Sequence, residues 1–298
     1  MRLLTFTHDG ATRTGALQGD SIVDLHATDS DIPDDMVALL QGGDAMLDKA
    51  RAAAESGDAA IALADAHLES PILVPPRILA IGLNYMSHWD EVPQHIKDGG
   101  FQLPKVPMMF NKQNTSVNGP YDPVLLPPES PELDWEGELG VVIGKTARRV
   151  AKENAFDIVA GYTIVNDVTI RDWQRAARTM TMGKSWDSHC PMGPTIVTKD
   201  EIADVENLNV VTTVDGKEMQ NFNTGEMIFD IATTIEYLST AFTLVPGDVI
   251  ATGTAAGVAL FREGQPWLTE GQVVRVDVES LGHLEATVVK DDGVSFIR

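Results

Sequence analysis

The most informative part of the chain is Asp134-Trp135-Glu136-Gly137-Glu138-Leu139-Gly140-Val141-Val142-Ile143-Gly144. Its second half is apolar and β-branched, which predicts a buried strand over residues 138–143. Side chains alternate between the faces of a strand, so Glu136 and Glu138 share one face. Asp134 has the same parity but lies nearer the start of the strand. Two adjacent carboxylates are unfavourable unless something compensates their charge, and a bound cation is the simplest compensation. For an isolated Glu-x-Glu pair, a solvated outer face is the commoner outcome.

A third acid follows another apolar run. Residues 160–166 predict a second buried strand, and Asp167 comes directly after it. Three carboxylates and water molecules form an octahedral oxygen shell that suits Mg²⁺ or Mn²⁺. The sequence has no cluster of Cys and His ligands and no H-E-x-x-H motif, which argues against zinc. We therefore expect Glu136, Glu138 and Asp167 to bind Mg²⁺ or Mn²⁺.

The rest of the chain predicts an α+β protein that is mostly β. Short apolar segments separated by turn residues predict strands over 2–7, 12–17, 21–25, 77–82, 249–251, 273–278 and 285–289. Alanine-rich and periodic segments predict helices over 44–55 and 229–242. Prolines at 71, 75 and 76 mark a boundary, which we place between a small N-terminal domain, residues 1–72, and a catalytic domain, residues 73–298.

Composition narrows the class of protein. The chain has 298 residues with 44 acidic and 22 basic side chains, a net charge of −22. This balance argues against nucleic-acid binding and against adsorption to anionic membranes. No apolar run approaches the roughly 18 residues of a membrane span, and the first ten residues lack the apolar core of a signal peptide. With Cys190 as the single cysteine, we expect a cytoplasmic protein without disulfides.

Several polar residues are candidates for chemistry. His88 and Glu91 are three residues apart, so on a helical turn the carboxylate would orient the imidazole and raise its basicity. A pair at the surface is the commoner outcome of this spacing. Lys184 could stabilise a developing oxyanion or lie at the surface as most lysines do. Arg171 and Gln174 follow Asp167 and could reach a substrate carboxylate, with a surface role about equally supported.

Several groups of residues resemble motifs of the fumarylacetoacetate hydrolase family. Asp134–Leu139 resembles its D-[YW]-E-x-E-L signature, and residues 82–91 resemble G-x-N-Y-x-x-H-x-x-E. Residues 183–194 resemble G-K-x-x-D followed by P-x-G-P, and residues 246–254 resemble P-G-D-x-[IL]-x-T-G-T. The resemblance extends over about residues 77–290.

The resemblance implies a mixed β-roll and, for most members, a homodimer. It assigns Glu136, Glu138 and Asp167 as metal ligands, Lys184 as a lysine that contacts substrate, and Thr254 as a threonine beside the site. It also implies that His88 and Glu91 form the catalytic pair, which reverses the preference for a surface pair. Lys112, in a stretch that resembles F-x-K…S of the family, is implied to border the pocket as a further candidate for substrate binding.

These residues favour a metal-dependent hydrolase that cleaves a C–C bond in a 2,4-diketo acid of the acylpyruvate type. His88 would activate water, and Lys184 would stabilise a pyruvate enolate. Decarboxylase, isomerase, hydratase or lyase chemistry on the same platform, with oxaloacetate or a hydroxymuconate as substrate, is the main alternative. A non-catalytic homologue is the remote one. Residues 93–107 are expected to form a lid over a small 2-oxo or 2,4-diketo acid.

Overall fold

The strand predicted from the apolar run lies near the middle of a large sheet. In the computed structural model, which describes residues 1–295, this strand is β11 (Gly137–Ile143), and all of its residues are buried. Leu139, Val141 and Ile143 contribute to one hydrophobic core, whereas Val142 contributes to another. β11 therefore separates two cores, which explains why its sequence is apolar on both faces.

The large sheet has twelve strands and is mainly antiparallel. Its main path runs β4-β3-β2-β1-β14-β12-β11-β17-β6-β7, with β5 paired to β1 and β8 paired to β14. The strand bounds are β1 Arg2–His8, β2 Ala11–Gln18, β3 Ser21–Asp24, β4 Ala60–Ala62, β5 His67–Glu69, β6 Ile78–Gly82, β7 Met108–Lys112, β8 Val117–Asn118, β12 Val159–Asn166, β14 Cys190–Thr198 and β17 Val249–Ala251. The predicted strands over 77–82 and 160–166 correspond to β6 and β12.

A second sheet packs close to the start of β11. It has the order β16-β15-β18-β19-β9, with the bounds β9 Val124–Leu126, β15 Asn209–Val214, β16 Lys217–Asn223, β18 Val273–Val278 and β19 Gly282–Lys290. A Cβ atom on Gly137 would lie 2.4 Å from Thr212 Oγ1 and 2.9 Å from Val276 Cγ1. The glycine between the two glutamates therefore allows the close approach of the second sheet.

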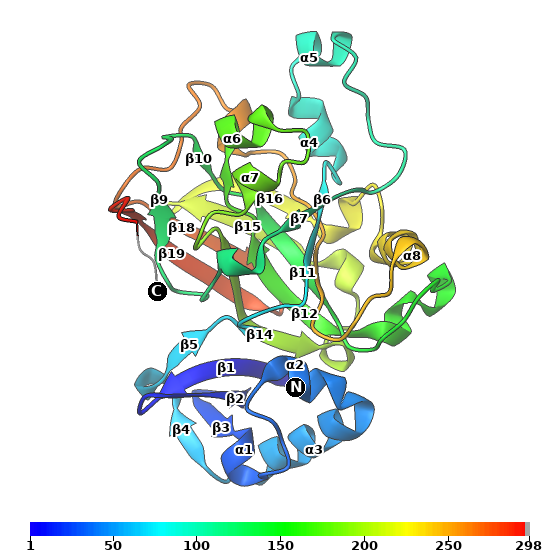
Figure 1. The fold of residues 1–298 in the computed structure, drawn as a ribbon, viewed down its shortest axis with the longest axis vertical. Helices are drawn as coiled ribbons and strands as arrows, with labels where there is room; N and C mark the ends of the chain where they lie inside the picture. The colour runs from blue at the N-terminus through cyan, green and yellow to red at the C-terminus, as the bar shows by residue number, and fades with distance from the viewer. Residues whose placement is uncertain (296–298) are drawn as a thin grey trace.

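The short helices α4, α5, α6 and α7 lie in the upper part of Figure 1. A two-stranded ladder pairs β10 (Leu133–Asp134) with β13 (Thr169–Ile170). The short helices and turns of the chain have the bounds α4 Met86–Glu91, α5 Gln94–Asp98, α6 Arg171–Ala176, α7 Thr181–Lys184, η1 Leu63–Asp65, η2 Asn114–Ser116, η3 Lys152–Ile158, η4 Lys199–Glu201, η5 Val205–Asn207, η6 Thr224–Glu226 and η7 Ala259–Phe261. The expected lid segment thus contains the short helix α5.

The N-terminal residues form strands β1–β5 and helices α1 (Leu25–Thr28), α2 (Met36–Gln41) and α3 (Gly43–Ser56). The alanine-rich helix predicted over residues 44–55 is α3, and Gly57 ends it with a φ of 67°. β1 pairs with β14, where Arg2 faces Val197, so the large sheet continues past the prolines at residues 71–76. Figure 1 shows this part, in blue, below the rest of the chain. The division at residue 72 remains a prediction.

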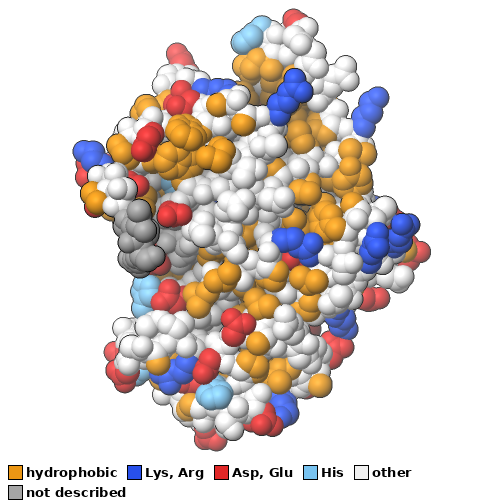
Figure 2. All heavy atoms as spheres, in the orientation of Figure 1, with side chains coloured by type: hydrophobic (Ala, Val, Ile, Leu, Met, Phe, Trp, Pro, Cys, Tyr) orange, Lys and Arg blue, Asp and Glu red, His pale blue; other side chains and the backbone are white. Residues whose placement is uncertain are grey.

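The fold class is confirmed as mostly β with mixed sheets. The predicted helix over 229–242 is α8 (Ile231–Ala241), which buries Ile235 and Leu238. Among residues 1–295, no helix combines the length and the apolar character needed to span a bilayer. On the face drawn in Figure 2, acidic and basic side chains are interspersed with apolar ones rather than segregated.

Candidate metal centre and substrate pocket

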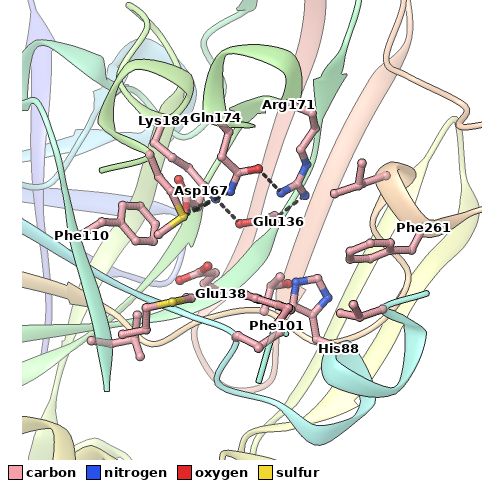
Figure 3. Close-up of a pocket in the computed structure, with 18 residues that line it drawn as sticks. His88, Phe101, Phe110, Glu136, Glu138, Asp167, Arg171, Gln174, Lys184 and Phe261 are labelled. Atoms are coloured by element: carbon pink, nitrogen blue, oxygen red, sulfur yellow. Dashed lines mark hydrogen bonds and ion pairs between the residues drawn. The ribbon is translucent and has the colours of Figure 1, made fainter. Parts of the chain in front are cut away.

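The three carboxylates predicted as metal ligands meet where β11 and β12 pair. Glu136 directly precedes β11, Glu138 lies within it, and Asp167 follows β12. The backbone N–H of Asp167 donates to Glu136 O at 2.9 Å, which fixes the two residues relative to each other. Each of the three offers a carboxylate oxygen within 4.8 Å of the other two, and all three side chains are buried. Figure 3 shows them around one pocket.

Two lysines neutralise part of the negative charge of the three carboxylates. Lys184, the last residue of α7, donates from Nζ to Glu136 Oε2 at 2.5 Å and to Asp167 Oδ2 at 2.7 Å. Lys112 Nζ donates to Asp167 Oδ1 at 2.6 Å. Burial alone would lower the pKa of Lys184, but the charges of Asp167 and Glu136 outweigh it and raise this pKa. The ammonium group therefore stays charged and acts as a point charge rather than as a base.

The two glutamates of the Glu-x-Glu pair are in opposite electrostatic situations. Burial would raise the pKa of Glu136, but the positive charges of Arg171 and Lys184 outweigh it and hold this pKa well below its usual range. Burial and the negative charges of Asp167 and Glu136 raise the pKa of Glu138 well above its usual range. Glu138 is therefore the carboxylate whose charge the protein leaves uncompensated.

The residues fit a hard divalent cation. The cluster contains four buried carboxylates and three buried cationic side chains, namely Asp134, Glu136, Glu138, Asp167, Lys112, Arg171 and Lys184. One more positive charge beside Glu138 would balance the four negative charges of these carboxylates. The donors of the three predicted ligands are all carboxylate oxygens, the kind that Mg²⁺ and Mn²⁺ prefer. The choice between these two metals stays open.

His88 and Glu91 form a close pair at the edge of the pocket. His88 Nδ1 lies 2.6 Å from Glu91 Oε1, and Glu91 Oε2 accepts from the backbone N–H of Gly257 at 2.9 Å. An ionised Glu91 can only accept, so Nδ1 carries the hydrogen and Nε2 keeps its lone pair. Figure 3 shows the imidazole across the pocket from Glu136. The pair is thus arranged as a base and the group that orients it.

Arg171 is occupied by carboxylates. Its Nε donates to Asp134 Oδ2 at 2.7 Å, its Nη2 donates to Glu136 Oε1 at 2.6 Å, and its Nη1 donates to Gln174 Oε1 at 3.1 Å. The guanidinium lines the pocket, but these contacts leave it little capacity for a substrate carboxylate. Among the described residues, the one hydrogen-bond acceptor of Gln174 Nε2 is Met180 Sδ at 3.7 Å, so the amide keeps a donor for substrate.

Lys112 and Thr254 are placed differently from each other. Thr254 lines the pocket, and its hydroxyl donates to Gly137 O at 2.8 Å while accepting from Gln220 Nε2 at 2.8 Å. Lys112 lies behind Asp167, where its Nζ also contacts the backbone oxygen of Lys184, and it is not among the pocket-lining residues. In this position the Lys112 ammonium supports the buried Asp167 carboxylate, and its contact with substrate remains a prediction.

The pocket itself is small and mostly apolar outside the charged cluster. Its volume is about 140 Å³. Phe101, from the expected lid segment, lines it, and the other apolar wall residues are Ile81, Leu83, Val92, Met108, Phe110, Met180, Leu260 and Phe261. The Phe261 ring packs edge-on against His88 with a centroid distance of 5.7 Å. No pattern in the sequence points to Phe261, because a single aromatic in a short turn has no periodicity.

Comparison with known proteins shows the family of the chain. The sequence profile described as the C-terminal part of fumarylacetoacetate hydrolase matches residues 77–289. A mitochondrial oxaloacetate tautomerase fahd2 of Xenopus laevis is 40% identical over 273 residues, which are 91% of this chain and 83% of that protein. Fumarylacetoacetate hydrolase of Exiguobacterium antarcticum is 34% identical with a TM-score of 0.83, covering 98% of this chain and 100% of that one.

A third relative was crystallised with ligands. The structure of maleylpyruvate hydrolase from Sphingobium sp. SYK-6 in complex with manganese(II) and pyruvate is 33% identical, has a TM-score of 0.80, and covers 98% of this chain and 100% of that chain. The protein with this fold and this acidic centre is a member of the fumarylacetoacetate hydrolase family, as its sequence suggested.

Proposed function

We propose that this chain is a divalent-metal-dependent tautomerase that interconverts the enol and keto forms of oxaloacetate or a similarly small 2-oxo acid. The observation that carries the proposal is the His88–Glu91 pair, which faces Glu136, Glu138 and Asp167 across one small pocket. A base on one side of a substrate and a metal-binding cluster on the other suit proton transfer next to a chelated carbonyl. The similarity to an oxaloacetate tautomerase supports the same reaction.

Each residue has a defined task in this reaction. Mg²⁺ or Mn²⁺, held by Glu136, Glu138 and Asp167, would supply Lewis-acid stabilisation of charge on the substrate oxygens. His88 Nε2 takes a proton from the carbon next to the carbonyl, and Glu91 stabilises the imidazolium that forms. The Lys184 ammonium offsets the negative charge of the enolate. The imidazolium then gives this proton to the enolate oxygen, which completes the enol. In the reverse direction His88 takes the proton from the enol oxygen and returns it to the same carbon.

The pocket favours a compact substrate. Its volume is about 140 Å³, whereas a cavity of roughly 150 Å³ holds a ligand of the size of benzene. A four-carbon 2-oxo acid fits this space better than a long acylpyruvate. The amide of Gln174 and the apolar wall then contact the part of the substrate that lies beyond the metal centre.

The second candidate function is hydrolysis of a C–C bond in an acylpyruvate-type 2,4-diketo acid, which gives pyruvate and a carboxylic acid. The same His88–Glu91 pair could take a proton from water, and the water would attack the distal carbonyl. The likeness to a maleylpyruvate hydrolase supports this alternative. Decarboxylation, hydration and lyase reactions need the same chelated 2-oxo acid but a different fate for the enolate.

A substrate panel separates these reactions. Oxaloacetate and several acylpyruvates are incubated with the purified protein and Mg²⁺ or Mn²⁺, and products are identified by mass. We expect faster loss of the ultraviolet absorbance of enol-oxaloacetate without release of carbon dioxide. Release of pyruvate and a second acid would assign a hydrolase instead, and carbon dioxide would assign a decarboxylase. No turnover of any 2-oxo acid would contradict the proposal and revive a non-catalytic role.

We further propose a homodimer in the cytoplasm, on the basis of the family resemblance and of the single buried Cys190. Light scattering coupled to size exclusion gives the mass in solution. A mass of one chain at micromolar concentration would contradict the dimer.

A further inference from the structure

The inference concerns Asp134, which is not one of the three predicted metal ligands. Its carboxylate is fully buried, with 0% of the residue exposed. Asp134 ends β10, and β10 pairs with β13, which directly precedes Arg171. The short ladder therefore holds the carboxylate at a fixed distance from the guanidinium.

The four hydrogen bonds to Asp134 come from two sides. Its Oδ2 accepts from Arg171 Nε at 2.7 Å and from the Leu260 N–H at 3.1 Å. Its Oδ1 accepts from the Ala259 N–H at 2.7 Å and from the Trp135 N–H at 2.8 Å. A buried carboxylate with this many donors is held in one orientation.

On one side, Asp134 shares the positively charged Arg171 guanidinium with Glu136. The guanidinium lies between Asp134 and Glu136, and its Nη2 is 2.6 Å from Glu136 Oε1. Without the charge of Asp134, the whole positive charge of Arg171 would act on Glu136. A carboxylate that is fully neutralised by a buried arginine is a poorer ligand for a cation.

On the other side, Asp134 holds the turn η7. Its contacts to the N–H groups of Ala259 and Leu260 fix the start of this turn. Leu260 and Phe261 line the pocket, and the Phe261 ring packs against His88. One buried carboxylate thus connects the metal-binding cluster with the wall that supports the base.

We propose that Asp134 is a positioning residue for both halves of the site. It shares the positive charge of Arg171, so that the negative charge of Glu136 stays available to the cation, and it fixes the turn that packs against His88. The proposal rests on the proposed function in that it needs a bound divalent cation and an active His88.

The first test replaces Asp134 with Asn, which keeps the shape but removes the charge. Mn²⁺ binding is measured by calorimetry on the whole chain, without substrate. We expect the affinity of D134N for Mn²⁺ to fall by about 10- to 100-fold, the usual effect of losing a partner of a metal ligand. The matched control is Asp172→Asn on α6, whose carboxylate accepts from Ser130 and does not touch Arg171, and it should bind Mn²⁺ like the wild type. Equal affinity of D134N and wild type would overturn the proposal.

A double variant separates charge from structure. D134N/R171Q removes both members of the buried pair, so Glu136 is again free of an excess positive charge. We expect its Mn²⁺ affinity to return to within about threefold of the wild type, whereas a merely structural role of Asp134 predicts a loss at least as large as in D134N. At saturating Mn²⁺, kcat of D134N should stay below the wild type because η7 has lost its acceptor. Full recovery of kcat would show that the turn η7 has no part in the role of Asp134.

A measurement on the unaltered chain covers the case in which the variants do not fold. In a crystal structure with Mg²⁺ and oxalate, Arg171 Nε should remain bonded to Asp134. Direct coordination of Mg²⁺ by Asp134, or an Arg171 turned to the oxalate, would overturn the proposal. A wild-type protein that binds no Mn²⁺ at all would instead contradict the proposed function, so the two failures are distinguishable.

Discussion

His88 Nδ1 lies 2.6 Å from Glu91 Oε1, and the second oxygen of the same carboxylate is held by the backbone N–H of Gly257 at 2.9 Å. The pair thus links α4 to the loop that follows β17, and it faces the pocket from the side opposite to Glu136. A base fixed in this way can act in proton transfer without first having to be oriented.

Replacing Glu91 with Gln should lower kcat, because the amide cannot stabilise the imidazolium form of His88. We expect a loss of about 10- to 100-fold, and a larger loss, about 10²- to 10⁴-fold, for His88→Ala. Mn²⁺ affinity should not change in either variant. The rate of oxaloacetate tautomerisation at saturating substrate gives the measurement. Asp90→Asn, at an exposed position of the same helix, is the control and should be fully active. An H88A protein with wild-type kcat would exclude His88 from the reaction.

Replacing Glu138 with Gln should weaken metal binding and stabilise the metal-free protein. The pKa of Glu138 is raised by burial and by Asp167 and Glu136, so its ionised form is unfavourable when no cation is present. This pKa lies above that of the unfolded chain. The resulting loss of folding stability is therefore absent at low pH and appears as pH rises toward and through the native pKa. At neutral pH and without a cation, E138Q should therefore have a larger free energy of unfolding than the wild type.

Chemical unfolding with a chelator present measures this gain, and calorimetry measures the Mn²⁺ affinity, which we expect to fall at least 100-fold with the loss of a ligand charge. Glu132→Gln, in the segment before β10, removes a carboxylate that pairs with Arg175 and serves as the control. If E138Q bound Mn²⁺ as tightly as the wild type, Glu138 would not be a ligand.

Much of this centre could be predicted from the sequence because strand periodicity is a local property. The spacing of Glu136 and Glu138 places both carboxylates on one face, and the apolar run before Asp167 brings it to the neighbouring strand. The structure shows that β11 and β12 are paired there, with Gly137 opposite Asn166. The geometry of these three residues therefore follows from two local patterns and one strand pairing.

The contacts of Arg171, Lys112 and Asp134 were beyond such reasoning. Arg171 was expected to reach substrate, but it lies between Asp134 and Glu136, a relationship created by the β10–β13 ladder. Lys112 comes from β7, and its partner Asp167 is 55 residues away in the sequence. Which carboxylate a buried cation pairs with depends on long-range packing, and no periodicity in the sequence specifies it. For the same reason, the sheet pairing of β1 with β14 across the expected domain boundary was not foreseen.

Acid should destabilise the protein through His189. This side chain is fully buried, and its Nε2 donates to Leu125 O at 2.7 Å. Burial lowers the pKa of His189 from 6.5 to about 3. As pH falls below 6.5, the unfolded chain binds a proton that the native state does not, so stability is lost between pH 6.5 and about pH 3. The expected loss is about 2 kcal/mol between pH 6.5 and about pH 5, at 1.36 kcal/mol for each unit.

The test compares the pH dependence of the unfolding free energy in the wild type and in His189→Gln, whose amide can keep the bond to Leu125 O. The slope of the variant should be smaller by close to one proton over this range. His95→Gln, at an exposed position on α5, should leave the slope unchanged. Equal slopes for wild type and H189Q would show that His189 already takes up its proton in the native state.

Cys190 should be unreactive in the folded protein, as expected for a buried residue without a chemical role. It is fully buried at the start of β14, and burial raises the pKa of its thiol to about 12. At neutral pH almost none of the thiol is in the nucleophilic thiolate form, and alkylating reagents cannot reach it.

Iodoacetamide should therefore modify the chain, as followed by mass, only after a denaturant is added, and a Cys190→Ser variant should give no adduct under either condition. Because the thiol has no part in the proposed reaction, oxidants that do not unfold the protein should leave its activity intact. Rapid alkylation of the native protein with loss of activity would show instead that Cys190 is reachable from the pocket.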